Sequence, residues 1–81
     1  MNVTVYSTTT CGICHALMQW LEKQDVAYKN VVIDTSPEAM EELITVSEGA
    51  IGTPFSVVDN DGAITKIAGF DQKQFRAALG L

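Results

Sequence analysis

The chain is poor in basic residues. It has five Lys and Arg against ten Asp and Glu in 81 residues, which gives a formal net charge of −5 at pH 7. A nucleic-acid backbone and an anionic membrane surface both attract a basic face. The charge therefore argues against nucleic acid and membranes as partners, and it leaves protein partners open.

Long apolar runs are also missing. No stretch approaches the ~20 apolar residues of a membrane span. Residues 1–4 show no basic region followed by an apolar stretch, so we predict no secretory signal and expect a cytoplasmic protein. The chain has no linker, repeat or low-complexity segment, and its hydrophobic content of 47 % suits a folded core. We therefore expect a single domain over residues 1–81, acting as a monomer.

Cysteine and histidine are scarce. The two Cys and the one His all lie in the segment C-G-I-C-H at residues 11–15. Cysteines three apart close too small a loop to stabilise a fold by much, and a reducing cytosol does not preserve structural disulfides. A zinc site normally needs four ligands, and this segment offers at most three. These arguments predict that Cys11 and Cys14 form a reactive pair, and that a single chain does not hold a metal ion.

The first half of the chain predicts two strands and two helices. Val3–Ser7 is β-branched and aromatic, as expected of a strand, and Ala27–Ile33 is a second one. Between them, apolar residues recur at helical spacing from Cys11 to about Lys23, with Thr10 or Cys11 as the N-cap. A second helix opens at Thr-Ser-Pro-Glu, residues 35–38, with either Thr or Ser as its cap. Its expected buried face comprises Met40, Leu43, Ile44 and Ser47.

The second half predicts a hairpin and a last helix. Phe55–Val58 and residues 63–67 are strands joined by a turn at residues 59–62. Asp71 and Gln74 are spaced as in a capping box, and Phe70 and Phe75 occupy the positions of a hydrophobic staple. The order β-α-β-α-β-β-α, with a right-handed crossover between the first two strands, predicts an α/β fold. We expect one four-stranded mixed sheet with three flanking helices.

The segment C-G-I-C-H allows three kinds of chemistry. Cys-x-x-Cys is a dithiol that can open and close, whereas Cys-x-x-Cys-His can attach a haem with His15 as an iron ligand. An iron–sulfur cluster shared between two copies is a further alternative. Haem needs a second axial ligand, for which Met18 and Met40 are the candidates. Four predicted strands leave little room for a helical shell around a haem, so the dithiol is favoured.

A cysteine at the start of a helix has an activated sulfur. Backbone N–H groups there lack intrahelical partners and the helix dipole is positive, which stabilises a thiolate at Cys11. A free Cys with a pKa of about 8.5 is only about 3 % thiolate at neutral pH. The dipole typically contributes about 0.3–1 kcal/mol, so a direct contact from the Cys14 amide is expected to add to it. Cys14 lies one turn deeper on the same face.

The chain resembles the thioredoxin-fold redoxins, and in particular the glutaredoxin family, over nearly its whole length. The resemblance is carried by VTVYS at residues 3–7, CGIC at 11–14, Gly-Thr-Pro at 52–54 and Ala-Gly-Phe-Asp at 68–71. It implies a thioredoxin fold and a dithiol–disulfide oxidoreductase in which Cys11 attacks and Cys14 resolves.

The resemblance also implies a substrate-binding surface. Thr53–Pro54 would be a cis peptide bond beside the attacking sulfur, and the Thr53 backbone would pair with an incoming peptide or thiol. From the residues alone, a trans proline that starts the third strand is the simpler expectation. An exposed apolar residue beside a nucleophile suggests protein docking, and Ile13 is such a residue. The residues expected to bind substrate are Thr10, Gly12, Ile13, Thr53, Pro54, Gly69 and Phe70.

The expected reductant depends on departures from the glutathione-using glutaredoxins. Those proteins usually carry a basic residue shortly before the first Cys, an aromatic between the cysteines, and Gly-Gly followed by acidic residues. Here these places hold Thr8 or Thr9, Gly12-Ile13 and residues 69–71. The pattern is more similar to NrdH-type redoxins, which thioredoxin reductase reduces with NADPH and which give electrons to ribonucleotide reductase. Glutathione stays the alternative reductant, and no bound cofactor is expected.

Overall fold

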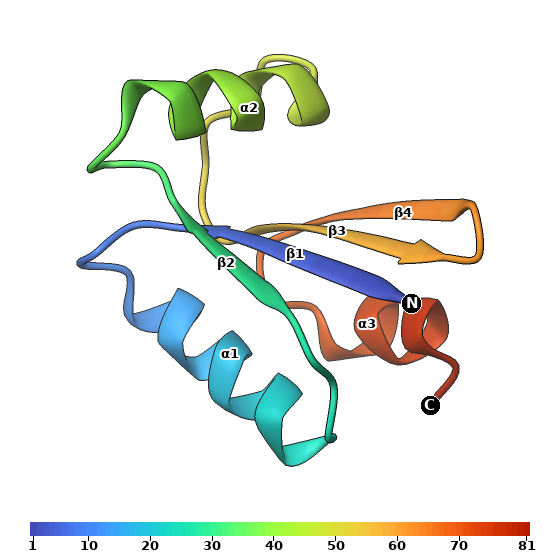
Figure 1. Ribbon diagram of the computed structural model, residues 1–81. Coiled ribbons are helices and arrows are strands. Elements are labelled where there is room, and N and C mark those ends of the chain that lie inside the picture. The colour runs from blue at the N-terminus through green and yellow to red at the C-terminus, as the bar shows by residue number, and fades with distance from the viewer.

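Seven elements follow one another in the predicted order β-α-β-α-β-β-α (Figure 1). The computed structural model describes all residues, 1–81. The strands are β1 (Asn2–Ser7), β2 (Lys29–Val32), β3 (Phe55–Asn60) and β4 (Ala63–Ala68). The helices are α1 (Gly12–Lys23), α2 (Pro37–Ser47) and α3 (Gln72–Leu79). None of the three helices has the length and apolar character required to cross a membrane.

The four strands form one mixed sheet in the order β2-β1-β3-β4. β1 pairs in parallel with β2 and antiparallel with β3, and β3 pairs antiparallel with β4. The predicted α/β fold with a four-stranded mixed sheet is confirmed. The parallel pair places the ends of β1 and β2 at the same edge of the sheet, with Ser7 beside Val32.

Helices cover both faces of the sheet, with α1 and α3 on one side and α2 on the other (Figure 1). Successive strand residues point to opposite faces. Val3 and Val5 therefore belong to the larger core cluster with Leu17 and Phe75, whereas Tyr6 joins the smaller cluster with Leu43. Two apolar layers thus fix the sheet between the helices.

The helix starts settle the alternatives that the sequence left open. Cys11 is the N-cap of α1, and Ser36, rather than Thr35, caps α2 by accepting a hydrogen bond from the Ala39 amide. Asp71 caps α3 by accepting bonds from the amides of Lys73 and Gln74. The caps set where each helix begins, and the first of them positions the candidate nucleophile.

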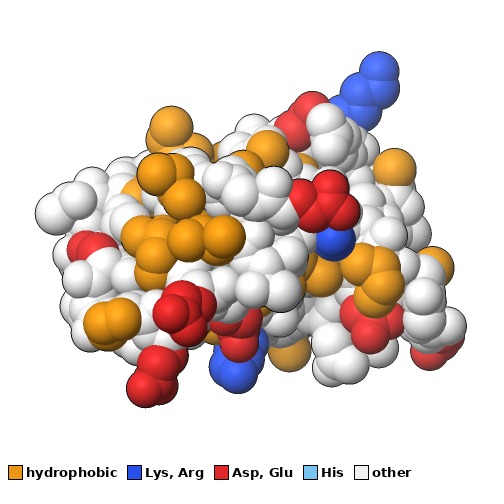
Figure 2. All heavy atoms as spheres, turned by 90° about the horizontal axis from the view of Figure 1, so that it is seen from above, with side chains coloured by type: hydrophobic (Ala, Val, Ile, Leu, Met, Phe, Trp, Pro, Cys, Tyr) orange, Lys and Arg blue, Asp and Glu red, His pale blue; other side chains and the backbone are white.

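One predicted buried residue of α2 is wrong. Ile44 is 41 % exposed. The residues of α2 that pack against the sheet are instead Ala39, Met40, Leu43 and Val46. The short α2 touches the sheet along a narrow stripe, and Ile44 lies beyond its edge. Apolar side chains gather on the side of the molecule where α2 lies (Figure 2).

Several strand limits also differ from the predictions. β2 begins at Lys29, because Ala27 and Tyr28 precede the pairing with β1. β3 extends to Asn60 and β4 to Ala68, so the turn comprises only Asp61 and Gly62. The hairpin ladder runs two residues further on β3 than the apolar pattern indicates, since backbone pairing continues through the polar Asp59 and Asn60.

Candidate active site

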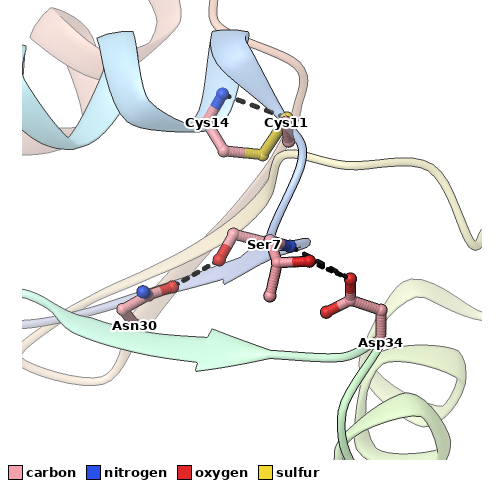
Figure 3. Close-up of a disulfide and its surroundings, with 6 residues drawn as sticks. Ser7, Cys11, Cys14, Asn30 and Asp34 are labelled. Atoms are coloured by element: carbon pink, nitrogen blue, oxygen red, sulfur yellow. Dashed lines mark hydrogen bonds between the residues drawn. A yellow bond between two sulfur atoms is a disulfide. The ribbon is translucent and has the colours of Figure 1, made fainter.

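Cys11 and Cys14 lie at the first turn of α1 and are joined by a disulfide (Figure 3). Their Cα atoms are 5.2 Å apart, within the range of about 4.4–6.8 Å that a disulfide requires. The helix geometry alone brings the two side chains to one face, so the pair can open and close with little backbone movement. The structure thus brings together the two cysteines that the sequence singled out.

The two sulfurs differ in accessibility. Cys14 is fully buried in the larger core cluster, whereas Cys11 is only partly buried at its edge. Gly12 and Ile13 are exposed next to it, and Ile13 has 60 % of its surface exposed. A substrate can therefore reach the pair from the side of Cys11, past an apolar side chain.

A backbone amide stabilises the sulfur of Cys11. The N–H of Cys14 donates to Cys11 Sγ over 3.1 Å, as expected for an N-cap side chain. The other free amides of the first turn and the helix dipole favour negative charge at the same place. Residues 8–13 contain no basic side chain, and Thr10, directly before Cys11, is exposed. Stabilisation of a thiolate here comes from the backbone.

The loop before Cys11 is tied to the loop after β2. Thr9 donates from its backbone N (3.1 Å) and from Oγ1 (2.6 Å) to the same oxygen, Oδ2 of Asp34. These bonds, first that of the hydroxyl and then that of the amide, lower the pKa of Asp34 below its ordinary value. From the sequence, Asp34 is not predicted as a site residue, and this contact is missed. The sequence did contain a clue to this contact, because the predicted parallel pairing of the first two strands places the residues that follow them side by side.

Thr53 and Pro54 precede β3 and are joined by a cis peptide bond. This is the isomer that the family resemblance implied, and the trans form expected from the residues alone is wrong. Phe55 pairs with Tyr6, so Pro54 lies at the end of the sheet where the chain leaves β1 for the Cys11 loop. Pro54 is buried and Thr53 is partly exposed. The Thr53 backbone is therefore placed at the same end of the molecule as the cysteine pair.

Gly69 joins this group through its backbone. Its N–H donates to the Pro54 carbonyl over 2.8 Å, and its φ of +78° is in the left-handed region that favours glycine. Gly69 is thus a turn residue that brings the end of β4 back beside the cis proline.

Phe70 packs against aromatic side chains of α1 and α3. Its ring packs 5.8 Å from that of Trp20 and 6.4 Å from that of Phe75, centroid to centroid. Trp20 lies more than two helical turns beyond Cys11. The expected staple between Phe70 and Phe75 is confirmed, and of the predicted site residues Phe70 is the one that packs into the core beside α3.

His15 follows the pair on α1 and is exposed. Its backbone N–H bonds to the Cys11 carbonyl, which continues the helix. No group of three or more His, Cys, Asp or Glu side chains converges anywhere in the chain in a way that would hold a metal ion.

Comparison with known proteins matches residues 3–62 to the glutaredoxin family. The chain belongs to the glutaredoxin family. The match covers the strand, the CGIC segment, the cis proline and the following hairpin turn. Members of this family are thiol–disulfide oxidoreductases, and the matched residues include the Cys11–Cys14 pair.

Within the family the chain is similar to NrdH-type redoxins. It is 38 % identical over 42 residues to the glutaredoxin-like protein NrdH of Lactococcus lactis, an alignment that spans 52 % of this chain and only 58 % of that relative. The glutaredoxin-like NrdH-redoxin of Escherichia coli, described as having a thioredoxin-like activity profile, is 26 % identical with a TM-score of 0.73. That match covers 94 % of this chain and 93 % of the other.

A more distant structure agrees on the fold. The glutaredoxin of Archaeoglobus fulgidus superimposes with a TM-score of 0.76 at 18 % identity, covering 95 % of this chain and 84 % of that chain. At this identity the likeness concerns the fold, which is the thioredoxin fold that the sequence resemblance implied.

Proposed function

We propose that this protein reduces disulfide bonds in other proteins through the Cys11–Cys14 dithiol. The observation that carries the proposal is the asymmetry of the pair, since the accessible Cys11 accepts a hydrogen bond at its sulfur from the amide of the buried Cys14. An accessible, anion-stabilised sulfur is suited to attack, and a buried neighbour is suited to resolve the product.

The reaction proceeds in two exchanges. The Cys11 thiolate attacks one sulfur of the substrate disulfide, a Cys11–substrate bond forms, and the other substrate sulfur leaves as a thiolate and takes a proton from water. Cys14 then loses its proton and attacks Cys11 Sγ, and the second substrate sulfur leaves in the same way. Two electrons and two protons have then passed to the substrate, and the protein holds its intramolecular disulfide.

Stabilisation of the Cys11 thiolate accelerates mainly the second exchange, in which Cys11 is the leaving group. Lowering the basicity of a sulfur reduces its nucleophilicity with a slope of about 0.4–0.5, so part of the gain in thiolate is lost in the attack. The same change makes Cys11 a better leaving group from the mixed disulfide with substrate or reductant. The contact from the Cys14 amide therefore supports cycling of the dithiol rather than attack alone.

The substrate surface comprises the residues around Cys11 and the cis proline. Ile13 offers an exposed apolar contact, with Thr10 and Gly12 beside it. The partly exposed Thr53 has its backbone at the same end of the sheet, where an extended peptide can pair with it. From the resemblance to NrdH-type redoxins we propose ribonucleotide reductase as a substrate protein, with this protein acting as a cytoplasmic monomer without a bound cofactor.

The charges near the site favour thioredoxin reductase, with NADPH, as the reductant over glutathione. Glutathione carries carboxylates at both ends, and the residues that flank Cys11 supply no cation. The charged side chain that does bond to the preceding loop, Asp34, is acidic. Electrostatic repulsion and the missing charge partner both disfavour a glutathione site.

Substitution of each cysteine tests the assignment of roles. Cys11→Ser is expected to abolish reduction of a protein disulfide, measured by the turbidity of reduced insulin, because no accessible sulfur remains. Cys14→Ser is expected to retain attack and to accumulate a mixed disulfide, measured as an added mass that dithiothreitol removes. Retained activity in Cys11→Ser, together with no adduct in Cys14→Ser, would overturn the roles.

The reductant is tested with the oxidised wild-type protein. We expect NADPH consumption with thioredoxin reductase and slow thiol formation with glutathione alone. Rapid reduction by glutathione, with no NADPH use by the reductase, would select the glutathione-dependent alternative.

A further inference from the structure

The three-residue loop that carries Cys11 has few constraints of its own. Thr9 and Thr10 are exposed, and no side chain of residues 8–10 is buried in the core. Within the loop, the Cys11 amide donates to the Thr8 carbonyl over a long 3.4 Å. A segment held by so little packing does not fix the position of the residue that follows it.

The start of this loop is anchored to β2. Ser7, buried at the end of β1, accepts a bond from the Ile33 amide over 2.9 Å, and its hydroxyl bonds to Asn30. Figure 3 shows Ser7 at the end of β1 bonded to Asn30 within β2, and Asp34 in the loop that follows β2. The chain is therefore well placed as far as Ser7 and must still span to Cys11.

The middle of the loop is anchored by Asp34 alone. Both donors of Thr9, the amide and the hydroxyl, converge on Asp34 Oδ2, and no other side chain hydrogen-bonds to residues 8–10. The contact joins residues 25 apart in the chain. It leaves Thr10 as the one unanchored residue between Thr9 and the N-cap sulfur.

We propose that Asp34 is a positioning residue for disulfide exchange, which fixes Thr9 and thereby the loop that delivers Cys11 to the N-cap of α1. The inference rests on the proposed function of the cysteine pair and adds to it a residue outside the motif. The carboxylate does not touch the sulfur. It acts by holding Cys11 where the Cys14 amide meets its Sγ and where an incoming disulfide meets it in line.

Both Thr9 donors bond to the same oxygen of Asp34. Substitutions can therefore test the hydrogen bonds that position the loop separately from the negative charge of the carboxylate. Asp34→Asn can present its amide oxygen to both Thr9 donors while removing the negative charge, whereas Asp34→Ala removes charge and hydrogen bonds together. Thr9→Val removes only the hydroxyl donor, whereas Thr9→Ser keeps it and removes only the methyl group. Glu41→Gln, an exposed neutralisation on α2, is the control for the loss of one charge.

The readout is the single-turnover reaction of each reduced variant with a small aromatic disulfide, which needs no protein docking, at a temperature far below its melting point. Loss of orientation at a reacting atom typically costs up to about 100-fold, and for this exposed loop we expect about a tenfold slower reaction in Asp34→Ala. Thr9→Val should be slower by about threefold, while Asp34→Asn, Thr9→Ser and Glu41→Gln should react within about twofold of wild type. Hydrogen exchange should show a protected Thr9 amide in wild type and Asp34→Asn, and an unprotected one in Asp34→Ala.

Two results would overturn the inference. One is an Asp34→Ala protein that reacts as fast as wild type, and the other is an Asp34→Asn protein as slow as Asp34→Ala, since charge rather than position would then act. If Asp34→Ala does not fold, the contrast between Thr9→Val and Thr9→Ser carries the test. A wild-type protein that fails to reduce any disulfide contradicts the proposed function instead, so the two failures are distinguishable.

Discussion

Replacing Ile13 by Ala should separate the reduction of protein disulfides from that of small disulfides. Ile13 has 60 % of its surface exposed beside Cys11. Burying a complete Ile side chain stabilises by about 1.5–3 kcal/mol, so the exposed part can contribute about 1–2 kcal/mol when a protein covers it. That free energy corresponds to a decrease in kcat/KM of about 5- to 30-fold for a protein substrate.

The assay compares two substrates and two variants. Insulin is the protein substrate, and a small aromatic disulfide, which does not reach across Ile13, should be reduced within about twofold of the wild-type rate. The control is Ile64→Ala, because Ile64 is 54 % exposed on β4 and pairs with Asp59, at the end of the sheet away from Ser7. Equal losses on both substrates would show that Ile13 acts on the sulfur itself, and equal losses in both variants would refute a docking role.

Two further predictions concern stability. Ser36→Ala removes the side-chain oxygen that accepts from the Ala39 amide over 3.4 Å. We expect the free energy of unfolding to fall by about 0.5–1 kcal/mol, seen as a melting temperature lower by a few degrees. The control variant Thr35→Ala should leave the melting temperature unchanged. The reverse order of the two variants would show that the cap is misassigned. Burial, followed by the contact with Glu42, raises the pKa of Tyr6 from 10.0 to about 12. The folded state thus favours the neutral phenol, so the stabilisation is complete below pH 10 and is lost as the pH rises toward 12. Urea unfolding across this range should show a steeper loss of stability in wild type than in Tyr6→Phe, and identical slopes would contradict the assignment.

Local patterns were enough to predict most of the elements. Helix starts depend on residues within a few positions of each other, and for this reason the cap at Asp71 and the staple of Phe70 and Phe75 were predicted correctly. Ile44 was wrong because helical spacing gives the direction of an apolar stripe but not the width of the surface it meets. Asp34 was missed because its partner, Thr9, is 25 residues away in the chain.

Spacing along a few consecutive residues is enough to predict that a cysteine begins a helix and that a second cysteine follows one turn later. The sequence also predicts the alternation of strands and helices that makes this fold possible. How completely each sulfur is covered depends on packing between elements, because the core cluster of α1, α3 and the sheet buries Cys14 and leaves Cys11 at its edge. Strand order and register likewise decided that Pro54 and Gly69 meet and that Asp34 reaches Thr9. Such contacts join distant segments, and no local propensity encodes them.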